Sequence, residues 1–160
     1  ATIVIMDNST TAMTGAQHHP GTGYTLREDQ TITADMEKLC ESFGFKRIRK
    51  VNPYKVKELQ QVLSEELNAD EPSVIIAKAP CALLKTGRIL PDKPLSINPE
   101  NCTGCKSCIN TGCPALEYVK EERTVKGKKF KGYSRINASL CVGCNTCFEV
   151  CKFNAIEEAS

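Results

Sequence analysis

The sequence predicts an α/β half-domain, part of a parallel sheet, followed by a small α+β domain rich in cysteine. Strand and helix patterns alternate through residues 1–79, which favours parallel strands. Eight of the ten cysteines fall between residues 102 and 151, a density that indicates bound metal or disulfides. Residues 1–100 hold 12 basic and 13 acidic side chains, whereas residues 101–160 hold 9 and 6. We therefore expect two unlike pieces.

Three strands are expected in the first piece. Residues 2–6 (TIVIM) and 73–78 (SVIIAK) are short apolar runs rich in β-branched side chains, which is typical of buried strands. Residues 45–51 (FKRIRKV) alternate between apolar and polar side chains, as a strand with one covered face does. With two intervening helices, these strands make half of an α/β domain rather than a whole one.

Two helices are expected between these strands. The first is capped by Thr33 or Asp35 and ends before Gly44, which suits the position after a helix C-terminus. Pro53 lies in the first turn of the second helix, where its missing N–H costs nothing. The apolar faces expected from helical spacing consist of Met36, Leu39, Cys40 and Phe43, and of Val56, Leu59, Val62, Leu63 and Leu67. We expect Cys40 to be a core residue.

A long polar loop, residues 7–24, follows the first strand. It leaves the carboxyl end of a parallel strand, the edge at which α/β sheets bind ligands, and its glycines allow close approach of the backbone. Oxygen atoms of Asp7, Asn8 and Thr10 suit a hard cation with an attached phosphate. The alternative is an ordinary connecting loop.

Residues 79–98 show few helix or strand signals and contain Pro80, Pro91 and Pro94. A linker at residues 80–94 is one interpretation, and an irregular tail packed on the first domain is the other. Cys81 lies in this segment and is assigned no role.

The second piece, residues 95–160, repeats itself. An Ile-Asn pair at residues 97–98, followed by C-x-G-C-x-x-C, recurs 39 residues later at residues 136–137 with the same continuation. The repeat implies two copies of one unit, packed with pseudo-twofold symmetry. Between the copies, residues 120–132 are charged around Gly127 and predict an exposed hairpin.

Each copy carries three cysteines at intervals of three and a fourth further on, as C-x2-C-x2-C-x4-C-P and then C-x2-C-x2-C-x3-C. Three such thiolates hold three corners of a [4Fe–4S] cubane, and the remote fourth binds the cluster of the other copy. Structural zinc, which takes four ligands, and disulfides are the weaker alternatives. The predicted ligand sets are Cys102, Cys105, Cys108 and Cys151 for one cluster, and Cys141, Cys144, Cys147 and Cys113 for the other.

The composition excludes several classes of protein. The formal net charge of +2 lacks the basic excess of a nucleic-acid binder. There is no stretch of 18 apolar residues that would cross a membrane. The beginning, ATIVIMDNS, lacks the basic region of a signal peptide, and Ala1 enters a strand pattern at once. We therefore expect a fragment or processed piece, with neither nucleic acid nor membrane as a partner.

The cysteine-rich piece resembles bacterial two-cluster ferredoxins over residues 95–157. Two departures exist: four residues rather than three separate Cys108 from Cys113, and Cys151 is followed by Lys152 rather than proline. The first departure alters the local turn, and neither removes a ligand.

The loop sequence DNSTTAMTGAQHHPGTG resembles the thiamine diphosphate loop of 2-oxoacid:ferredoxin oxidoreductases. It is most similar to the large subunit of the indolepyruvate type, in which a two-cluster ferredoxin domain ends the chain. Both halves match in that order, so the resemblance covers nearly all 160 residues. It implies that the chain is the C-terminal part of such a subunit, with residues 1–79 forming half of the thiamine diphosphate domain.

The same resemblance implies roles for residues of the loop. Asn8 would give a side-chain oxygen to Mg²⁺, and Thr10 would give its backbone carbonyl. Met13 and Thr14 would lie near the thiazolium ring or the substrate. His18 and His19 are candidates for proton transfer or for holding a substrate carboxylate, and the alternative for both is a structural hydrogen bond.

One departure concerns what precedes the loop. Thiamine enzymes carry G-D-G or G-D-S about thirty residues before the Asn, whereas seven residues precede Asn8 here. We therefore expect that the isolated chain neither binds thiamine diphosphate tightly nor catalyses.

The implied parent reaction is the CoA-dependent oxidative decarboxylation of an aryl 2-oxoacid, with electrons relayed through two clusters to external ferredoxin. A smaller partner subunit and a cytoplasmic location are also implied. A pyruvate or 2-oxoglutarate enzyme of the same superfamily is one alternative. A pure electron-transfer module, with the α/β half as a docking scaffold, is the other.

Overall fold

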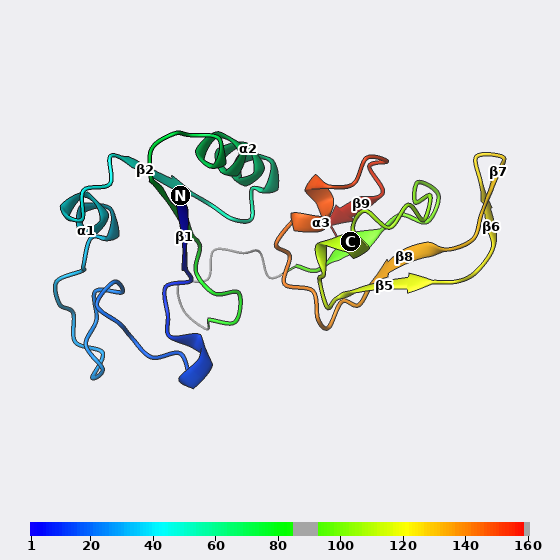
Figure 1. The fold of residues 1–160 in the computed structure, drawn as a ribbon. Coiled ribbons are helices and arrows are strands. Elements are labelled where there is room, and N and C mark those ends of the chain that lie inside the picture. The colour runs from blue at the N-terminus through cyan, green and yellow to red at the C-terminus, as the bar shows by residue number, and fades with distance from the viewer. Residues whose placement is uncertain (85–92, 159–160) are drawn as a thin grey trace. The chain divides into compact units, whose positions relative to one another are not determined.

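The computed structural model describes residues 1–84 and 93–158 (Figure 1). The chain divides into two compact units, Ala1–Ile89 and Leu90–Ser160. This division falls inside the linker expected at residues 80–94, of which residues 85–92 lie outside the described residues. Within the described ranges, no helix is long and apolar enough to cross a membrane.

The first unit is built on a three-stranded parallel sheet, as predicted. Its strands are β1 (Thr2–Asp7), β2 (Arg47–Val51) and β3 (Ser73–Lys78), in the order β1-β3-β2. The central strand β3 is buried along almost its whole length, because it has a hydrogen-bonded neighbour on each side. All three carboxyl ends therefore meet at one edge of the sheet, from which the long loop departs.

Two helices, α1 (Met36–Ser42) and α2 (Val56–Leu67), pack on the sheet. Successive residues of β3 point to opposite faces, and the two apolar clusters follow this alternation. One cluster joins Ile75 and Ala77 to Val51 and Val62, with Leu59 and Leu63 against it. The other joins Val74 and Ile76 to Cys40, with Ile5, Met36, Phe45 and Ile48 against it. The prediction that Cys40 is a core residue is confirmed.

The N-terminus of α1 is capped by Asp35, which selects between the two predicted caps. Its carboxylate accepts hydrogen bonds from the backbone N–H groups of Glu37 at 3.0 Å and Lys38 at 3.2 Å. The other end closes at Gly44, whose φ of +90° lies in the left-handed region that glycine adopts without strain.

The predicted start of α2 was wrong. Pro53 lies in a turn before the helix, and α2 begins at Val56. Asn52 organises this turn, because its side-chain oxygen accepts the N–H of Tyr54 at 3.0 Å and its backbone oxygen accepts that of Lys55 at 3.0 Å. An Asx turn competes with the first turn of a helix for the same backbone groups.

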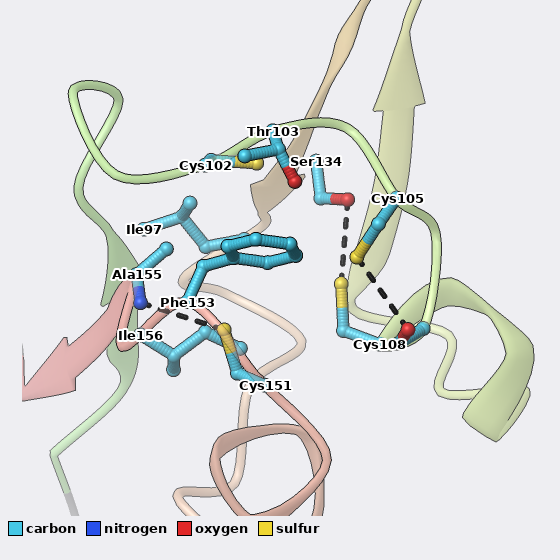
Figure 2. A pocket seen from close by; sticks show the side chains of 11 residues that line it. Ile97, Cys102, Thr103, Cys105, Cys108, Ser134, Cys151, Phe153, Ala155 and Ile156 are labelled. Atoms are coloured by element: carbon cyan, nitrogen blue, oxygen red, sulfur yellow. Dashed lines mark hydrogen bonds between the residues drawn. The ribbon is translucent and has the colours of Figure 1, made fainter. Parts of the chain in front are cut away.

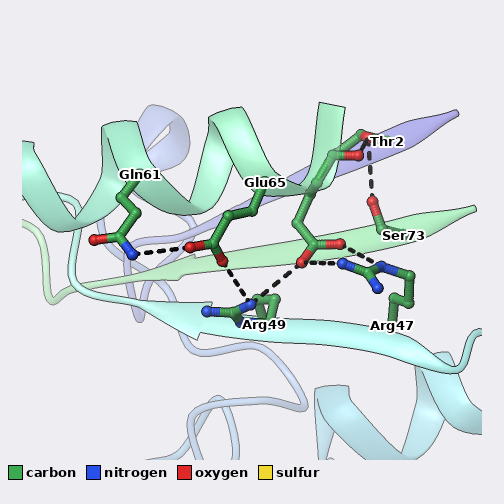
Figure 3. A network of polar contacts seen from close by, with 7 residues as sticks. Thr2, Arg47, Arg49, Gln61, Glu65 and Ser73 are labelled. Atoms are coloured by element: carbon green, nitrogen blue, oxygen red, sulfur yellow. Dashed lines mark hydrogen bonds and ion pairs between the residues drawn. The ribbon is translucent and has the colours of Figure 1, made fainter. Parts of the chain in front are cut away.

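The C-terminal end of α2 is held to the sheet by a polar network around the buried Glu66 (Figure 3). The guanidinium of Arg47 donates to both carboxylate oxygens of Glu66, at 2.9 and 3.0 Å. Arg49 bridges Glu66 at 3.4 Å and Glu65 at 3.0 Å. The hydroxyl of Thr2 donates to the backbone oxygen of Glu66 at 3.0 Å, so the network joins α2 to both outer strands.

The second unit contains three antiparallel strand pairs and short helical turns. The pairs are β4 (Leu95–Ile97) with β9 (Ile156–Glu158), β5 (Leu116–Val119) with β8 (Tyr133–Ile136), and β6 (Arg123–Val125) with β7 (Lys128–Phe130). The β6–β7 pair is the predicted hairpin, turning at Lys126 and Gly127, which both have positive φ. One helix, α3 (Thr146–Glu149), and a 3-10 turn, η2 (Ile109–Thr111), complete the unit.

Strand pairing in this unit exchanges between the two sequence copies. The strand before the first cysteine run, β4, pairs with the strand after the second run, β9, while β8 pairs with β5. Equivalent hydrogen bonds close both pairs: the N–H of Asn98 donates to Ala155 at 2.7 Å, and that of Asn137 donates to Ala115 at 2.8 Å. Each copy is thus completed by the end of the other, as the repeat predicts.

Candidate functional site

Four cysteines line one pocket of the second unit (Figure 2). Three come from the first cysteine run and the fourth, Cys151, from the end of the second copy. Ile97, Phe153 and Ile156 supply apolar walls. This group of four, Cys102, Cys105, Cys108 and Cys151, is the first of the two ligand sets expected from the sequence.

The cysteine-bearing loop owes its shape to glycine and asparagine. The backbone oxygen of Asn98 accepts the N–H of Cys102 at 3.2 Å, and its side-chain oxygen accepts that of Glu100 at 2.9 Å. Gly104 has a φ of +65°, and a Cβ there would stand 2.1 Å from the backbone oxygen of Gly132. A larger residue at Gly104 is therefore incompatible with this loop.

Hydrogen-bond donors surround the sulfur atoms of this pocket. The Sγ of Cys108 lies 3.3 Å from the hydroxyl of Ser134, and both residues are buried. The backbone N–H of Ala155 lies 3.4 Å from the Sγ of Cys151, and the hydroxyl of Ser107 lies 3.4 Å from that of Cys105. In the thiol form Cys108 and Cys105 donate to these hydroxyls; the same hydroxyls can donate to a thiolate or a cluster-bound sulfur, which they stabilise.

The thiol pKa values follow burial and these donors. Burial raises the pKa of Cys108, which the Ser134 hydroxyl opposes only in part. Burial would also raise the pKa of Cys105, but hydrogen bonds from Ser107 and neighbouring groups outweigh it and the pKa falls. The pKa is thus shifted downward at the exposed Cys105 and upward at the buried Cys108.

The other four cysteines of the segment are Cys113, Cys141, Cys144 and Cys147. Burial raises the pKa of the Cys147 thiol to about 12, and the nearby sulfurs of Cys144, Cys113, Cys141 and, least, Cys108 add to this rise. The Sγ of Cys141 lies 3.3 Å from the backbone N–H of Leu95. Four thiols are thus close enough to repel one another as thiolates, which a positively charged metal core would relieve.

The chemistry of both groups fits a [4Fe–4S] cluster. Each consists of four sulfur donors, and the first is walled by apolar side chains, which suits a cofactor whose ligands are thiolates. Among residues 1–84 and 93–158, no three His, Cys, Asp or Glu side chains converge as ligands of a single metal ion would. A cubane bonds its four cysteines through four separate irons, so its ligands stand further apart.

In the first unit, the loop after β1 begins with a network that fixes Asp7 and Asn8. Asp7 pairs with Nζ of Lys78 at 2.9 Å and accepts the N–H of Ser9 at 2.9 Å. Burial would raise the pKa of Asp7, but these two contacts outweigh it and hold the pKa below its usual range. The side-chain oxygen of Asn8 accepts the N–H of Thr10 at 3.2 Å.

The remaining predicted loop residues lie further along the same excursion. Thr10 is buried, and its hydroxyl lies 3.4 Å from the backbone oxygen of Gln17. Met13 lies in the 3-10 turn η1 (Ala12–Thr14) with its side chain 99% exposed, and the Thr14 hydroxyl contacts the Gln17 side chain. Asn8 and Thr10 thus both lie in the loop that leaves the carboxyl end of β1.

The two histidines form different hydrogen bonds through Nδ1. The Thr22 hydroxyl donates to the backbone oxygen of His19 at 2.8 Å, so at 3.2 Å it accepts from Nδ1 of His18. Nδ1 of His19 accepts the N–H of Gly21 at 3.1 Å. For neutral rings, Nε2 of His18 is therefore a proton acceptor, and Nε2 of His19 carries the proton.

Three contacts at these sites were not expected from the sequence. Lys78 was treated as the end of a strand, yet it pairs with Asp7. The N–H of Cys81, for which no role was assigned, donates to the backbone oxygen of Asn8 at 2.8 Å. The third contact is that of Ser134 with Cys108. An alignment of the two copies would have drawn attention to Ser134, because it stands seven residues before Cys141, where the other copy has Leu95 seven residues before Cys102.

The two units match two described protein families. Residues 1–77 match the thiamine pyrophosphate enzyme family, C-terminal TPP binding domain. Residues 134–157, which contain the second cysteine run, match the 4Fe-4S binding domain. Fold, site and family matches together define the class: an oxidoreductase segment in which a C-terminal TPP binding domain region is followed by a ferredoxin-like 4Fe-4S region.

Curated relatives make the assignment more specific. The chain is 38% identical to "Indolepyruvate oxidoreductase subunit IorA" of Archaeoglobus fulgidus, over 98% of this chain and 24% of that protein. The IorA subunits of Pyrococcus horikoshii and Methanothermobacter thermautotrophicus are 35% and 31% identical, over 98% and 97% of this chain and 23% of each relative. The chain is therefore homologous to one segment of the IorA subunits, and it spans about a quarter of their length.

Proposed function

We propose that the chain is part of an enzyme that oxidatively decarboxylates aryl 2-oxoacids with CoA, giving an aryl-acetyl-CoA, CO₂ and two electrons. The electrons pass through two [4Fe–4S] clusters to an external ferredoxin. The name of the relatives, indolepyruvate oxidoreductase, supports the aryl substrate class. A smaller second subunit completes the enzyme.

The observation that carries this proposal is the pocket formed by cysteines from both sequence copies. Cys151 is 43 residues from Cys108 in sequence, yet both line it. This exchange is what a pair of cubane sites with crossed fourth ligands requires. A zinc site uses a single ion and gives no reason for the third cysteine of each run.

Asn8 and Thr10 would contribute oxygen ligands to Mg²⁺, and Asp7 helps fix the start of their loop. Bound thiamine diphosphate would supply the carbanion stabilisation that decarboxylation of a 2-oxoacid needs. The Lys78–Asp7 ion pair supports this arrangement, because it fixes the loop start to the central strand. We expect Met13 and Thr14 to contact the thiazolium ring or substrate, since η1 projects them from the loop. The isolated chain is not expected to bind thiamine diphosphate tightly.

The hydrogen bonds of the two histidines support distinct roles. Nε2 of His18 can accept a proton, because Nδ1 holds its proton against Thr22. Nε2 of His19 can donate to a substrate carboxylate or carbonyl oxygen, because its Nδ1 is occupied by the Gly21 N–H. Adjacent residues thus offer one base and one donor.

The test uses the complete complex, purified without oxygen. CoA-dependent reduction of ferredoxin is followed with indolepyruvate, phenylpyruvate, pyruvate and 2-oxoglutarate side by side. The proposal expects clear preference for the two aryl acids. Preference for pyruvate or 2-oxoglutarate would refute the aryl substrate and keep the reaction type. No activity with any acid, despite intact clusters, would favour the electron-transfer module.

A further inference from the structure

The two cysteine groups differ in the hydroxyl groups around them, although the sequence copies are otherwise closely matched. Equivalent positions can be compared directly, because the copies are offset by 39 residues throughout the cysteine runs. The first group, Cys102, Cys105, Cys108 and Cys151, is called the first sulfur cage below. The second group, Cys141, Cys144, Cys147 and Cys113, is called the second sulfur cage.

The first difference is Ser134, on β8. Its hydroxyl lies 3.3 Å from the Sγ of Cys108, and the side chain is only 2% exposed. The residue at the equivalent position of the other copy is Leu95, which has no hydroxyl. A buried hydroxyl therefore touches a sulfur of the first cage, and its counterpart at the second cage is apolar.

The second difference is Thr103, which lines the pocket of the first cage. Its hydroxyl is buried and, within the described part of the chain, meets no partner at full hydrogen-bond geometry, while it lies near enough to Cys105 to help lower the pKa of that thiol. Figure 2 shows the side chain at the wall beside Cys102, with its oxygen turned toward the interior. A buried hydroxyl without a partner is costly, and a cluster sulfur in this pocket would satisfy it. The equivalent residue is Val142.

Two other kinds of contact occur at both cages. Each cage has a hydroxyl beside its middle cysteine, from Ser107 at 3.4 Å and from Thr146 at 3.3 Å. Each also has a backbone N–H beside one sulfur, from Ala155 at 3.4 Å and from Leu95 at 3.3 Å. These contacts are matched, so Ser134 and Thr103 are the side-chain hydroxyls that distinguish the first cage, and the backbone N–H of Ile109 beside Cys108 acts in the same sense.

A positive charge adds to the difference in the same sense. Arg123, on the hairpin strand β6, donates from its guanidinium to the backbone oxygen of Cys102 at 2.6 Å. Arg123 belongs to the segment that lies between the two copies. Within the described residues, no equivalent segment follows the second cysteine run. A cation beside the first cage favours any state with more negative charge there.

We propose that the hydroxyls of Ser134 and Thr103 make the cluster in the first sulfur cage the more easily reduced of the two. The added electron spreads negative charge over the sulfurs, and hydroxyl donors bind that charge more strongly than they bind the oxidised cluster. Electrons released by the decarboxylation therefore collect at the first cage. The step is a one-electron transfer: the second cluster is oxidised as the first is reduced, and the hydroxyl protons stay on oxygen. The proposal rests on the two-cluster function above.

The experiment is a potentiometric titration of the complete complex, followed by EPR, after iron and acid-labile sulfide analysis. Ser134→Ala removes the contact to Cys108, and Thr103→Val removes the other hydroxyl at nearly constant volume. Val142→Thr introduces a hydroxyl at the second cage. Ser96→Ala is the matched control, because that serine also lies on a strand of this unit and its hydroxyl is directed to the backbone oxygen of Glu157.

The proposal expects Ser134→Ala and Thr103→Val to lower the midpoint potential of one and the same cluster. Each lowers the equilibrium share of electrons at that cluster by up to about tenfold, which is about 59 mV for one electron. Val142→Thr raises the potential of the other cluster, and Ser96→Ala moves neither.

Two results would overturn the inference. Unchanged potentials in Ser134→Ala and Thr103→Val, with both clusters present, would show that the hydroxyls do not tune either cluster. A shift in the midpoint potential of the cluster whose EPR signal is lost in Cys144→Ala would show that the two hydroxyls act on the second sulfur cage, which contradicts the proposal. Iron and sulfide for only one cluster in the wild-type complex would refute the two-cluster function itself, and this separates the two failures.

Discussion

The ammonium group of Lys78 lies 2.9 Å from the carboxylate of Asp7, joining the carboxyl ends of the neighbouring strands β3 and β1. Asp7 is nearly buried, while Lys78 is partly exposed. The pair therefore ties the first residue of the candidate thiamine loop to the central strand of the sheet. Backbone hydrogen bonds from Ala79 to Asp7 at 3.0 Å and from Cys81 to Asn8 at 2.8 Å continue the same seam.

Lys78→Met should therefore destabilise the first unit by about 1 kcal/mol and raise the pKa of Asp7. The folded-state pKa of Asp7 is lowered, so its contribution is present above the ordinary carboxylate pKa and is lost as pH falls through the lowered value. Thermal unfolding at neutral and acidic pH measures this. Lys50→Met is the control, because Lys50 and Glu37 pair at 2.8 Å with both side chains exposed. An equal loss of stability in Lys50→Met would contradict the claim that the Lys78–Asp7 pair contributes more than an exposed ion pair does.

Glu66→Gln should destabilise the chain by about 2 kcal/mol, since it leaves a buried network with a weaker acceptor for Arg47. Hydrogen bonds from Arg47 outweigh burial and lower the pKa of Glu66. Its stabilisation is thus full above the ordinary glutamate pKa and disappears as pH falls below it. Denaturant unfolding from pH 7 to pH 3 should show a shallower acid loss in the variant. Glu65→Gln, in the exposed part of the network, should cost less. The same pH dependence in Glu66→Gln and wild type would contradict this account.

Asn8→Ala in the complete complex should raise the Mg²⁺ concentration needed for half-maximal activity by about tenfold, because it removes one oxygen ligand of a hard cation. It also removes the side-chain oxygen that accepts the N–H of Thr10. Asn8→Asp keeps a side-chain oxygen for both the cation and this N–H, and should retain most of the affinity for Mg²⁺. Titration of activity against Mg²⁺ measures the effect. Similar behaviour of the two variants would argue that Asn8 shapes the loop without touching the metal.

Substitutions of the two histidines should change different kinetic constants. His18→Gln removes the proposed base and should lower kcat by about 10²-fold, with little change in KM. His19→Gln removes the proposed donor to the substrate carboxylate and should mainly raise KM for the 2-oxoacid. Steady-state kinetics with saturating CoA separates these effects. Unchanged kinetics in either variant would assign that histidine to a structural hydrogen bond of the loop.

Much of this fold follows from local patterns. The three strands are read from apolar runs, and the cap of α1 narrows to Thr33 or Asp35 because few side chains accept from a helix N-terminus. The cysteine spacing also predicts that Cys151 joins the first cysteine run, because a cubane needs a remote fourth ligand. These features depend on residues near one another in sequence or on fixed metal chemistry.

Other features depend on distant residues and could not be predicted. Pro53 suits a first helical turn, but the Asn52 side chain forms a competing turn. The contacts of Ser134 with Cys108 and of Lys78 with Asp7 join elements whose approach only the tertiary fold determines. The strands β4 and β9 are too short, at three residues each, to give an alternation pattern of their own.

In the proposed arrangement, the fourth cysteine of each copy binds the cluster of the other copy. EPR spectra and iron content of the reduced complex in four variants test this pairing: Cys105→Ala, Cys151→Ala, Cys144→Ala and Cys113→Ala. Cys105→Ala and Cys151→Ala should lose the same cluster signal, while Cys144→Ala and Cys113→Ala should lose the other. Loss of one signal by both Cys144→Ala and Cys151→Ala would mean that each copy holds its own cluster, and would contradict the account.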